Sequence, residues 1–167
     1  MSQPDSSADF VITRVFDAPR ELVYRTMTET AHLQKWWGPQ GCSIEVVSHD
    51  PQPGGIFHYL MRFGPAVEMY GKFLYRELTP SERIVFVNGF ADAEGNYIHH
   101  AMSPTWPVEV LNTATLTDEG GKTRLTLHST PLNASDIEIA TFKSGHASLN
   151  DGFGGMYDVY ANYLASL

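Results

Sequence analysis

Polar side chains stand among large apolar ones on the same faces of expected strands, a combination typical of a ligand-binding pocket. Alternation places one such set on a strand over residues 56–63 and another on a strand over residues 106–117. They are Phe57, Tyr59 and Met61 in the first strand and Val108, Val110 and Asn112 in the second. Burying the amide of Asn112 without a partner would cost roughly 1–3 kcal/mol, and a cavity with a few placed polar groups avoids that cost. Ordinary core packing would use the same apolar residues, and a register error of one residue would turn these faces outward.

The last helix and the tryptophans supply most of the remaining candidate lining residues. Outside the two strands the candidates are Trp36, Trp37, Met69, Phe86, Trp106, Phe153, Met156, Tyr157 and Tyr160. Those from Phe153 to Tyr160 share one face of a C-terminal helix at helical spacing. One ring of the Trp36–Trp37 pair is expected to seal the sheet's edge and the other to line the cavity mouth. Trp106 lies between two prolines and is expected to mark a bend at a strand start.

The spacing of the histidines and the single cysteine does not indicate a metal site or a cofactor site. His99 and His100 are adjacent, so on a strand they would point to opposite faces and could not easily bind one ion. The sequence has neither an HExxH motif nor clustered cysteines and histidines. We therefore expect no metal site and no cofactor.

The sequence alone locates no residue for nucleophilic or general acid–base catalysis. Cys42 has no identifiable activating partner and is expected to be a small buried hydrophobe. Glu68, Asp92 and Glu109 could transfer protons only if they point inward, and the alternation around Glu68 favours a solvated side chain. Proton-transfer catalysis stays open without an assigned residue.

Composition excludes several classes of partner. The chain has 167 residues, 43% of them hydrophobic, and a formal net charge of -8. An acidic protein is unsuited to nucleic acid or to an anionic membrane surface, because both require clustered Lys and Arg. No stretch approaches the roughly 18 apolar residues that a membrane span requires, so we expect no membrane insertion. One cysteine and a polar N-terminus without an apolar signal segment favour a soluble, cytoplasmic protein.

The order of the elements predicts an α+β helix-grip fold. Residues 1–9 are expected to form a flexible tail and residues 10–167 a single domain. A strand at 10–16 precedes two short helices, and period-two alternation with short turns then runs from Ser43 to Ser129. Strands without intervening helices imply an antiparallel meander, here of six to seven strands in total. A curved sheet of that size needs its concave face covered, and only the long C-terminal helix is long enough to cover it.

Several segments, taken in order, resemble the family named for the activator of the heat-shock-protein-ninety ATPase. They are Val15-Phe-Asp-Ala-Pro-Arg-Glu-Leu-Val-Tyr24, Leu33-Gln-Lys-Trp-Trp-Gly38, Pro53-Gly-Gly55, Gly71-x-Phe-x-Tyr-x-Glu-Leu-Thr-Pro80 with Glu82-Arg-Ile-Val-Phe86, and Gly121-Lys-Thr-Arg-Leu-Thr-Leu127. The resemblance covers about residues 10–165 and extends to the SRPBCC superfamily of START domains, the birch-pollen allergen fold and polyketide cyclases. It implies a central cavity between the sheet and the last helix. Phe153 stands where the family usually has tryptophan, so the pocket floor is expected to be wider or looser.

Three functional hypotheses follow from the residues and the resemblance, because this fold carries several functions. The first is binding of a small apolar or aromatic molecule in the cavity. The second is an enzyme of the cyclase or hydratase type that uses the same cavity. The third is a protein-interaction domain with a chaperone partner, ranked lowest. Association into a homodimer is left open by the sequence.

Overall fold

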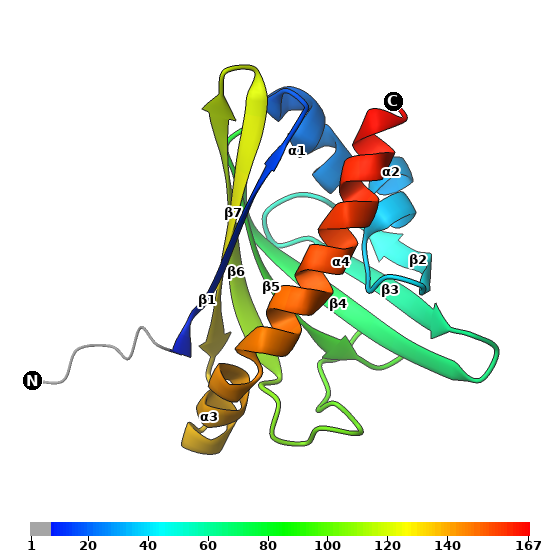
Figure 1. Ribbon diagram of the computed structural model, residues 1–167. Coiled ribbons are helices and arrows are strands. Elements are labelled where there is room, and N and C mark those ends of the chain that lie inside the picture. The colour runs from blue at the N-terminus through cyan, green and yellow to red at the C-terminus, as the bar shows by residue number, and fades with distance from the viewer. Residues whose placement is uncertain (1–7) are drawn as a thin grey trace, which may run out of the picture.

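A curved antiparallel sheet of seven strands wraps around one long helix (Figure 1). The computed structural model describes residues 8–167. The strands are β1 (Phe10–Phe16), β2 (Ser43–His49), β3 (Ile56–Phe63), β4 (Val67–Thr79), β5 (Arg83–Ala91), β6 (Glu109–Glu119) and β7 (Lys122–Leu132). Their order in the sheet is β1-β7-β6-β5-β4-β3-β2. The predicted α+β helix-grip fold is confirmed.

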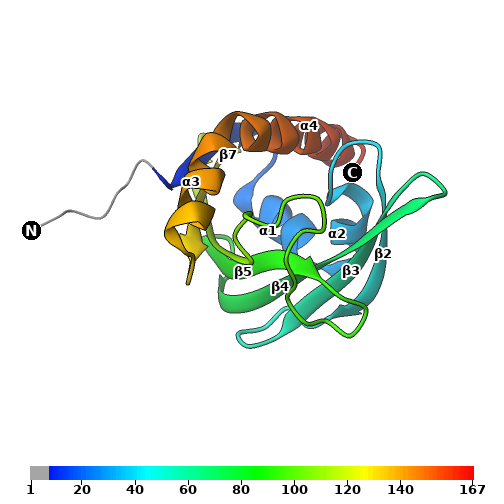
Figure 2. The ribbon, with the colours of Figure 1, turned by 90° about the horizontal axis from the view of Figure 1, so that it is seen from below.

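Within residues 8–167 four helices complete the fold, two before and two after the long strand meander in the chain. They are α1 (Arg20–Thr28), α2 (Thr30–Trp36), α3 (Asp136–Ser144) and α4 (His146–Ala165). A capping box formed by Ser135 and Glu138 starts α3. Gly145 separates α3 from α4, and a Cβ atom there would lie 2.9 Å from Cζ3 of Trp106. Seen from below, α4 closes the open side of the ring that the sheet forms (Figure 2).

The segment between β5 and β6 differs from the sequence-based expectation. A strand was expected to begin at Trp106, whereas β6 begins at Glu109. Pro107 is fully buried and has no N–H to donate to a strand ladder, which explains the later start. Residues 92–108 therefore form a connection with only isolated bridges, including His100 to Ser103.

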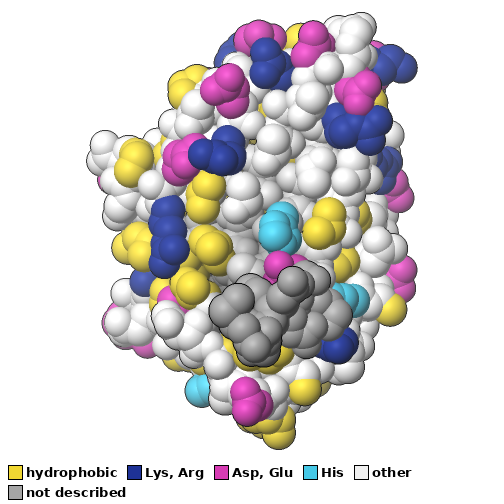
Figure 3. Space-filling view, turned by 90° about the vertical axis from the view of Figure 1, so that its left-hand side faces the viewer, with side chains coloured by type: hydrophobic (Ala, Val, Ile, Leu, Met, Phe, Trp, Pro, Cys, Tyr) yellow, Lys and Arg dark blue, Asp and Glu magenta, His cyan; other side chains and the backbone are white. Residues whose placement is uncertain are grey.

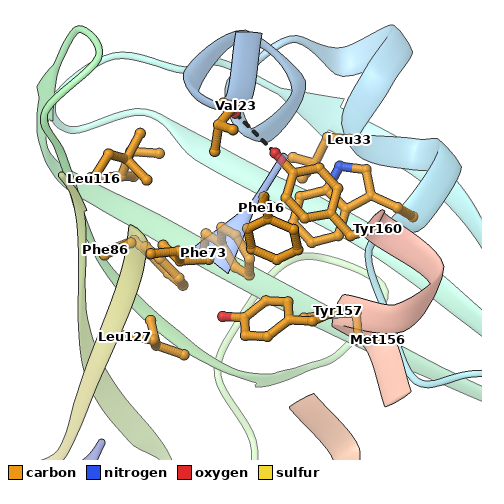
Figure 4. Packing of buried hydrophobic residues seen from close by; sticks show 14 of the residues in the cluster. Phe16, Val23, Leu33, Phe73, Phe86, Leu116, Leu127, Met156, Tyr157 and Tyr160 are labelled. Carbon is orange, nitrogen blue, oxygen red and sulfur yellow. Dashed lines mark hydrogen bonds between the residues drawn. The ribbon is translucent and has the colours of Figure 1, made fainter. Parts of the chain in front are cut away.

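The C-terminal half of α4 is fastened to α1 and α2 by one buried tyrosine. The Tyr160 hydroxyl donates to the carbonyl oxygen of Val23 at 3.1 Å (Figure 4). It also lies 2.6 Å from Oγ1 of Thr26. The ring of Tyr160 stacks on that of Trp36 with centroids 3.9 Å apart. Trp36 in turn donates its indole N–H to the carbonyl oxygen of Thr26. These contacts hold this half of α4 against α1 and α2.

The start of the described chain also contacts α4. The carbonyl oxygen of Ala8 accepts a hydrogen bond from Nε2 of His146 at 2.9 Å. Asp9 lies 2.8 Å from Nε2 of His128 on β7. Residues 8 and 9 thus lie against the domain, while the rest of the tail expected over residues 1–9 falls outside the described residues.

The outer surface carries charges of both signs. Figure 3 shows the side that includes β1, where acidic and basic side chains are interspersed with small groups of hydrophobic ones. Val11 and Val15 of β1 are among the exposed hydrophobic residues. Across residues 8–167, no helix has the length and apolar character needed to cross a membrane.

The role of Tyr160 as a fastening point can be tested with a matched pair of substitutions. Tyr160→Phe removes hydrogen bonds in a buried site and should lower the free energy of unfolding by about 1 kcal/mol. Tyr157 is equally buried on α4, but the described residues supply no hydrogen bond to its hydroxyl, so Tyr157→Phe should cost little. Urea unfolding of both variants measures the difference. Equal costs would show that the hydroxyl of Tyr160 does not fasten α4.

Candidate functional site

A cavity of about 510 Å³ lies between the concave face of the sheet and α4. Its lining includes members of both buried hydrophobic clusters of the protein. The larger cluster fills the end of the sheet near α1 and α2 and contributes Tyr59, Met61 and Met156. The smaller one, built around Phe10, contributes Val110 and Phe142. The cavity is thus lined from both clusters, and Phe153 packs against each of them.

The sheet side of the cavity depends on a close approach between β3 and β4. Tyr59 on β3 pairs with Gly71 on β4, and both line the cavity. A Cβ atom at residue 71 would lie only 2.4 Å from Cζ of Tyr59. Glycine at this position therefore allows the tyrosine ring to lie on the neighbouring strand. Met61, Phe63 and Met69 extend the same apolar wall.

The helix side is a stripe of residues spaced three and four apart on α3–α4. The stripe consists of Gly145, Ser148, Leu149, Gly152, Phe153 and Met156. This spacing belongs to one face of a continuous helix. Ser148 and Gly152 line the cavity and are also exposed, so the cavity reaches the surface beside them. A Cβ atom on Gly152 would meet no atom within 4 Å.

One end of the cavity is bounded by the β5–β6 connection, which Figure 2 shows on the side nearest the viewer. His100, Ser103 and Trp106 come from this connection. The ring of His100 packs edge-on against Phe90 of β5, with centroids 4.5 Å apart. Trp106 packs on Phe142 of α3 at 5.3 Å. Contacts with regular elements thus position a segment that has no regular structure of its own.

Three polar side chains of β5, β6 and β7 form a hydrogen-bonded row on the cavity wall. Nδ2 of Asn112 donates to Oδ1 of Asn88 at 2.8 Å, and Oγ of Ser129 donates to Oδ1 of Asn112 at 2.6 Å. Nδ2 of Asn112 also donates to the carbonyl oxygen of Val110 at 3.0 Å. These bonds satisfy the buried amide of Asn112, which the sequence identified as unusual on an apolar face.

The described part of the cavity wall holds no carboxylate, ammonium or guanidinium group. Among the described lining residues there is no Asp, Glu, Lys or Arg. Burial raises the pKa of Tyr59, and the nearby side chain of Trp37 only partly opposes this shift. Tyr59 therefore stays protonated and neutral at physiological pH. Its hydroxyl can polarise a ligand by hydrogen bonding but is poorly suited to act as a base.

More than half of the lining residues predicted from the sequence lie on the cavity wall. They are Trp37, Tyr59, Met61, Met69, Trp106, Val110, Asn112, Phe153 and Met156. The structure places the others away from it: Trp36, Phe57, Phe86, Val108, Tyr157 and Tyr160. Of these, Phe57 is covered by His49, and Phe86 stacks on Phe73 with centroids 4.2 Å apart. Trp36 is buried in the larger hydrophobic cluster, whereas Trp37 lines the cavity.

Several lining residues were missed by the sequence analysis, chiefly Asn88, Phe90, His100, Ser129, Phe142, Leu149 and Gly152. Asn88 could have been found, because alternation along β5 puts it on the same face as Phe86. His100 could not, because the β5–β6 connection has no periodicity that would orient its side chains.

The carboxylates considered for proton transfer do not line the cavity. Glu68 pairs with Arg62 on the exposed side of the sheet. Asp92 accepts hydrogen bonds from the backbone N–H groups of Glu94 and Asn96, which hold its pKa below the usual range. Across residues 8–167, no group of three or more His, Cys, Asp or Glu side chains could hold a metal ion.

A curved antiparallel sheet closed by a long helix, with an apolar cavity between them, defines the helix-grip class of α+β domains. Within that class, residues 17–158 match the family model described as Activator of Hsp90 ATPase homolog 1-like protein. The chain therefore belongs to this family. No curated protein matches the sequence.

Solved structures share the fold at low sequence identity. A solution NMR structure of a protein from Arthrobacter aurescens superposes with a TM-score of 0.81 at 20% identity, covering 99% of this chain and 91% of that one. A crystal structure of a Mycobacterium smegmatis protein gives 0.73 at 24% identity, covering 99% and 93%. The AHSA1 protein from Silicibacter pomeroyi gives 0.68 at 19% identity, covering 94% and 97%. At these identities the similarity establishes the fold and not an activity.

The packing of Tyr59 over Gly71 can be tested by a double-mutant cycle. Gly71→Ala introduces a methyl group where the tyrosine ring lies, and the overpacking should destabilise the protein by about 1–3 kcal/mol. In the Tyr59→Ala background the clash is removed, so the same glycine substitution should cost little. Denaturant unfolding of the four proteins measures the coupling. An equal cost in both backgrounds would contradict this account of the wall.

Proposed function

We propose that the protein binds a small, uncharged apolar or aromatic molecule in the cavity between the sheet and α4. The observation that carries the proposal is a cavity of about 510 Å³ whose wall is mainly apolar and aromatic. Ligand pockets typically span roughly 300–1,000 Å³ and combine such walls with a few placed polar groups. The row of Asn88, Asn112 and Ser129 supplies those polar groups here.

The physical gain from binding comes from the apolar wall. Apolar side chains that face water or a void are less favourably placed than apolar side chains packed against a fitting molecule. Covering apolar surface contributes about 25 cal/mol per Å². The described lining residues include no cationic side chain of Lys or Arg and no carboxylate. The wall therefore offers no charged partner to compensate an ionised ligand for the hydration it would lose. The wall therefore favours neutral molecules.

A second candidate function is a cyclase- or hydratase-type reaction in the same cavity. The supporting observation is that Tyr59 and His100 are titratable groups on the wall. Because burial raises the pKa of Tyr59, its hydroxyl would donate a hydrogen bond to a substrate oxygen and leave proton removal to another group. The wall lacks a carboxylate for that step among the described residues, which ranks this candidate below simple binding.

A substitution at the cavity mouth tests the binding proposal. Gly152→Leu places a side chain where a Cβ atom meets no neighbour, so it should occupy the mouth without a clash. Leucine favours helix over glycine by roughly 0.5–1 kcal/mol, so the variant should be at least as stable as the parent. Binding of Nile red, a neutral dye that fluoresces in apolar surroundings, should fall at least tenfold.

Gly154→Leu is the matched control for this experiment. It makes the same substitution on the same helix at a position that also has open space but does not line the cavity. It should gain similar helix stability and bind Nile red like the parent protein. Loss of dye binding in both variants, or in neither, would contradict the assignment of the cavity as the binding site.

A further inference from the structure

The polar row on the cavity wall has only one consistent arrangement of donors and acceptors. The Asn112 side-chain amide contacts the backbone carbonyl oxygen of Val110 at 3.0 Å. A carbonyl oxygen can only accept, so the atom of Asn112 that faces it must be the nitrogen. The other end of the amide is then the oxygen, which agrees with its contact to the hydroxyl of Ser129 at 2.6 Å.

The orientation of Asn112 determines the orientation of Asn88. The same Asn112 nitrogen lies 2.8 Å from the Asn88 amide. Two amide nitrogens would present hydrogens to each other, so the Asn88 atom at this contact must be the oxygen. The Asn88 nitrogen therefore points away from the row. The backbone carbonyl of Val110 thus determines, through Asn112, that the nitrogen of the Asn88 amide points away from the row.

The Asn88 nitrogen has no partner within the described protein. No acceptor among the described residues lies in hydrogen-bond contact with it, and no buried side-chain nitrogen or oxygen among them lacks a partner. The nitrogen is therefore accessible. Because Asn88 lines the cavity, its N–H groups are available to a molecule bound there. An unmet donor of this kind favours a ligand that brings an acceptor.

His100 adds a second donor to the wall. Its Nδ1 accepts a hydrogen bond from the backbone N–H of Met102 at 3.0 Å, so the proton of the neutral ring lies on Nε2. His100 packs on Phe90, which follows Asn88 by two positions and faces the same side of β5. Both donors therefore adjoin the same end of this strand.

We propose that the cavity selects uncharged molecules that carry a carbonyl-type oxygen, which accepts a hydrogen bond from Nδ2 of Asn88. This inference rests on the proposed binding function and adds the chemical class of the ligand. The hydrogen-bonded row supplies the selectivity, because Asn112 and Ser129 hold the Asn88 amide in one orientation before any ligand arrives. A hydrocarbon of the same shape would fill the cavity but leave this donor unmet.

Benzophenone and diphenylmethane form a suitable pair of probes, because they share two phenyl rings and differ in a central carbonyl or methylene group. Dissociation constants are measured by displacement of Nile red from the parent protein and from Asn88→Leu. The affinity ratio of benzophenone to diphenylmethane should fall roughly 2- to 10-fold in the variant, the effect of one hydrogen bond. Diphenylmethane should bind the variant at least as well as the parent, which also shows that its cavity is intact.

Two further variants make the result decisive. Asn88→Val removes the same amide with a shorter, strand-favouring side chain and should give the same change if Asn88→Leu does not fold. Asn150→Asp alters an exposed asparagine of α4 outside the cavity and should leave the ratio unchanged. An unchanged ratio in the Asn88 variants overturns the donor assignment while the binding function stands. Failure of both probes to displace the dye from the parent overturns the proposed function as well.

Discussion

The cavity exists because α4 is held at both ends and carries small residues between them. Near its C-terminus, Tyr160 fastens the helix to α1 and stacks on Trp36. At its start, Gly145 lies so close to Trp106 that a Cβ atom would approach the indole ring to 2.9 Å. Between these points Gly152 contributes no side chain to the interior. The helix therefore can neither sink onto the sheet nor fill the space beneath it.

The chemistry of the wall follows from the same arrangement. The strands present large apolar side chains where the helix does not reach, and only a short row of amides and a hydroxyl interrupts them. Backbone contacts orient this row, so its outward donor is defined before a ligand arrives. Several surface charges form ion pairs on the outer faces, as Arg62 with Glu45 illustrates. An acidic protein thus encloses a cavity whose described wall carries no carboxylate, ammonium or guanidinium group.

The sequence predicted the fold well because local patterns determine it. Period-two alternation located the strands, and the helical spacing from Phe153 to Tyr160 located the C-terminal helix. The site was harder to predict, because a core residue and a cavity residue have the same chemistry. Phe57 and Tyr59 share one strand face, yet His49 covers the first and the second borders the cavity. His100 lies in a non-periodic connection whose path only tertiary contacts determine.

The methionines offer the most direct measurement of where a ligand binds. Met61, Met69 and Met156 line the cavity from three different elements, whereas Met27 and Met102 do not line it. Methyl resonances of ¹³C-methionine-labelled protein can be followed by NMR during titration with Nile red. The cavity account expects the first three methyl signals to shift together and those of Met27 and Met102 to stay in place. Saturable shifts confined to Met102, or no shifts despite dye binding, would contradict it.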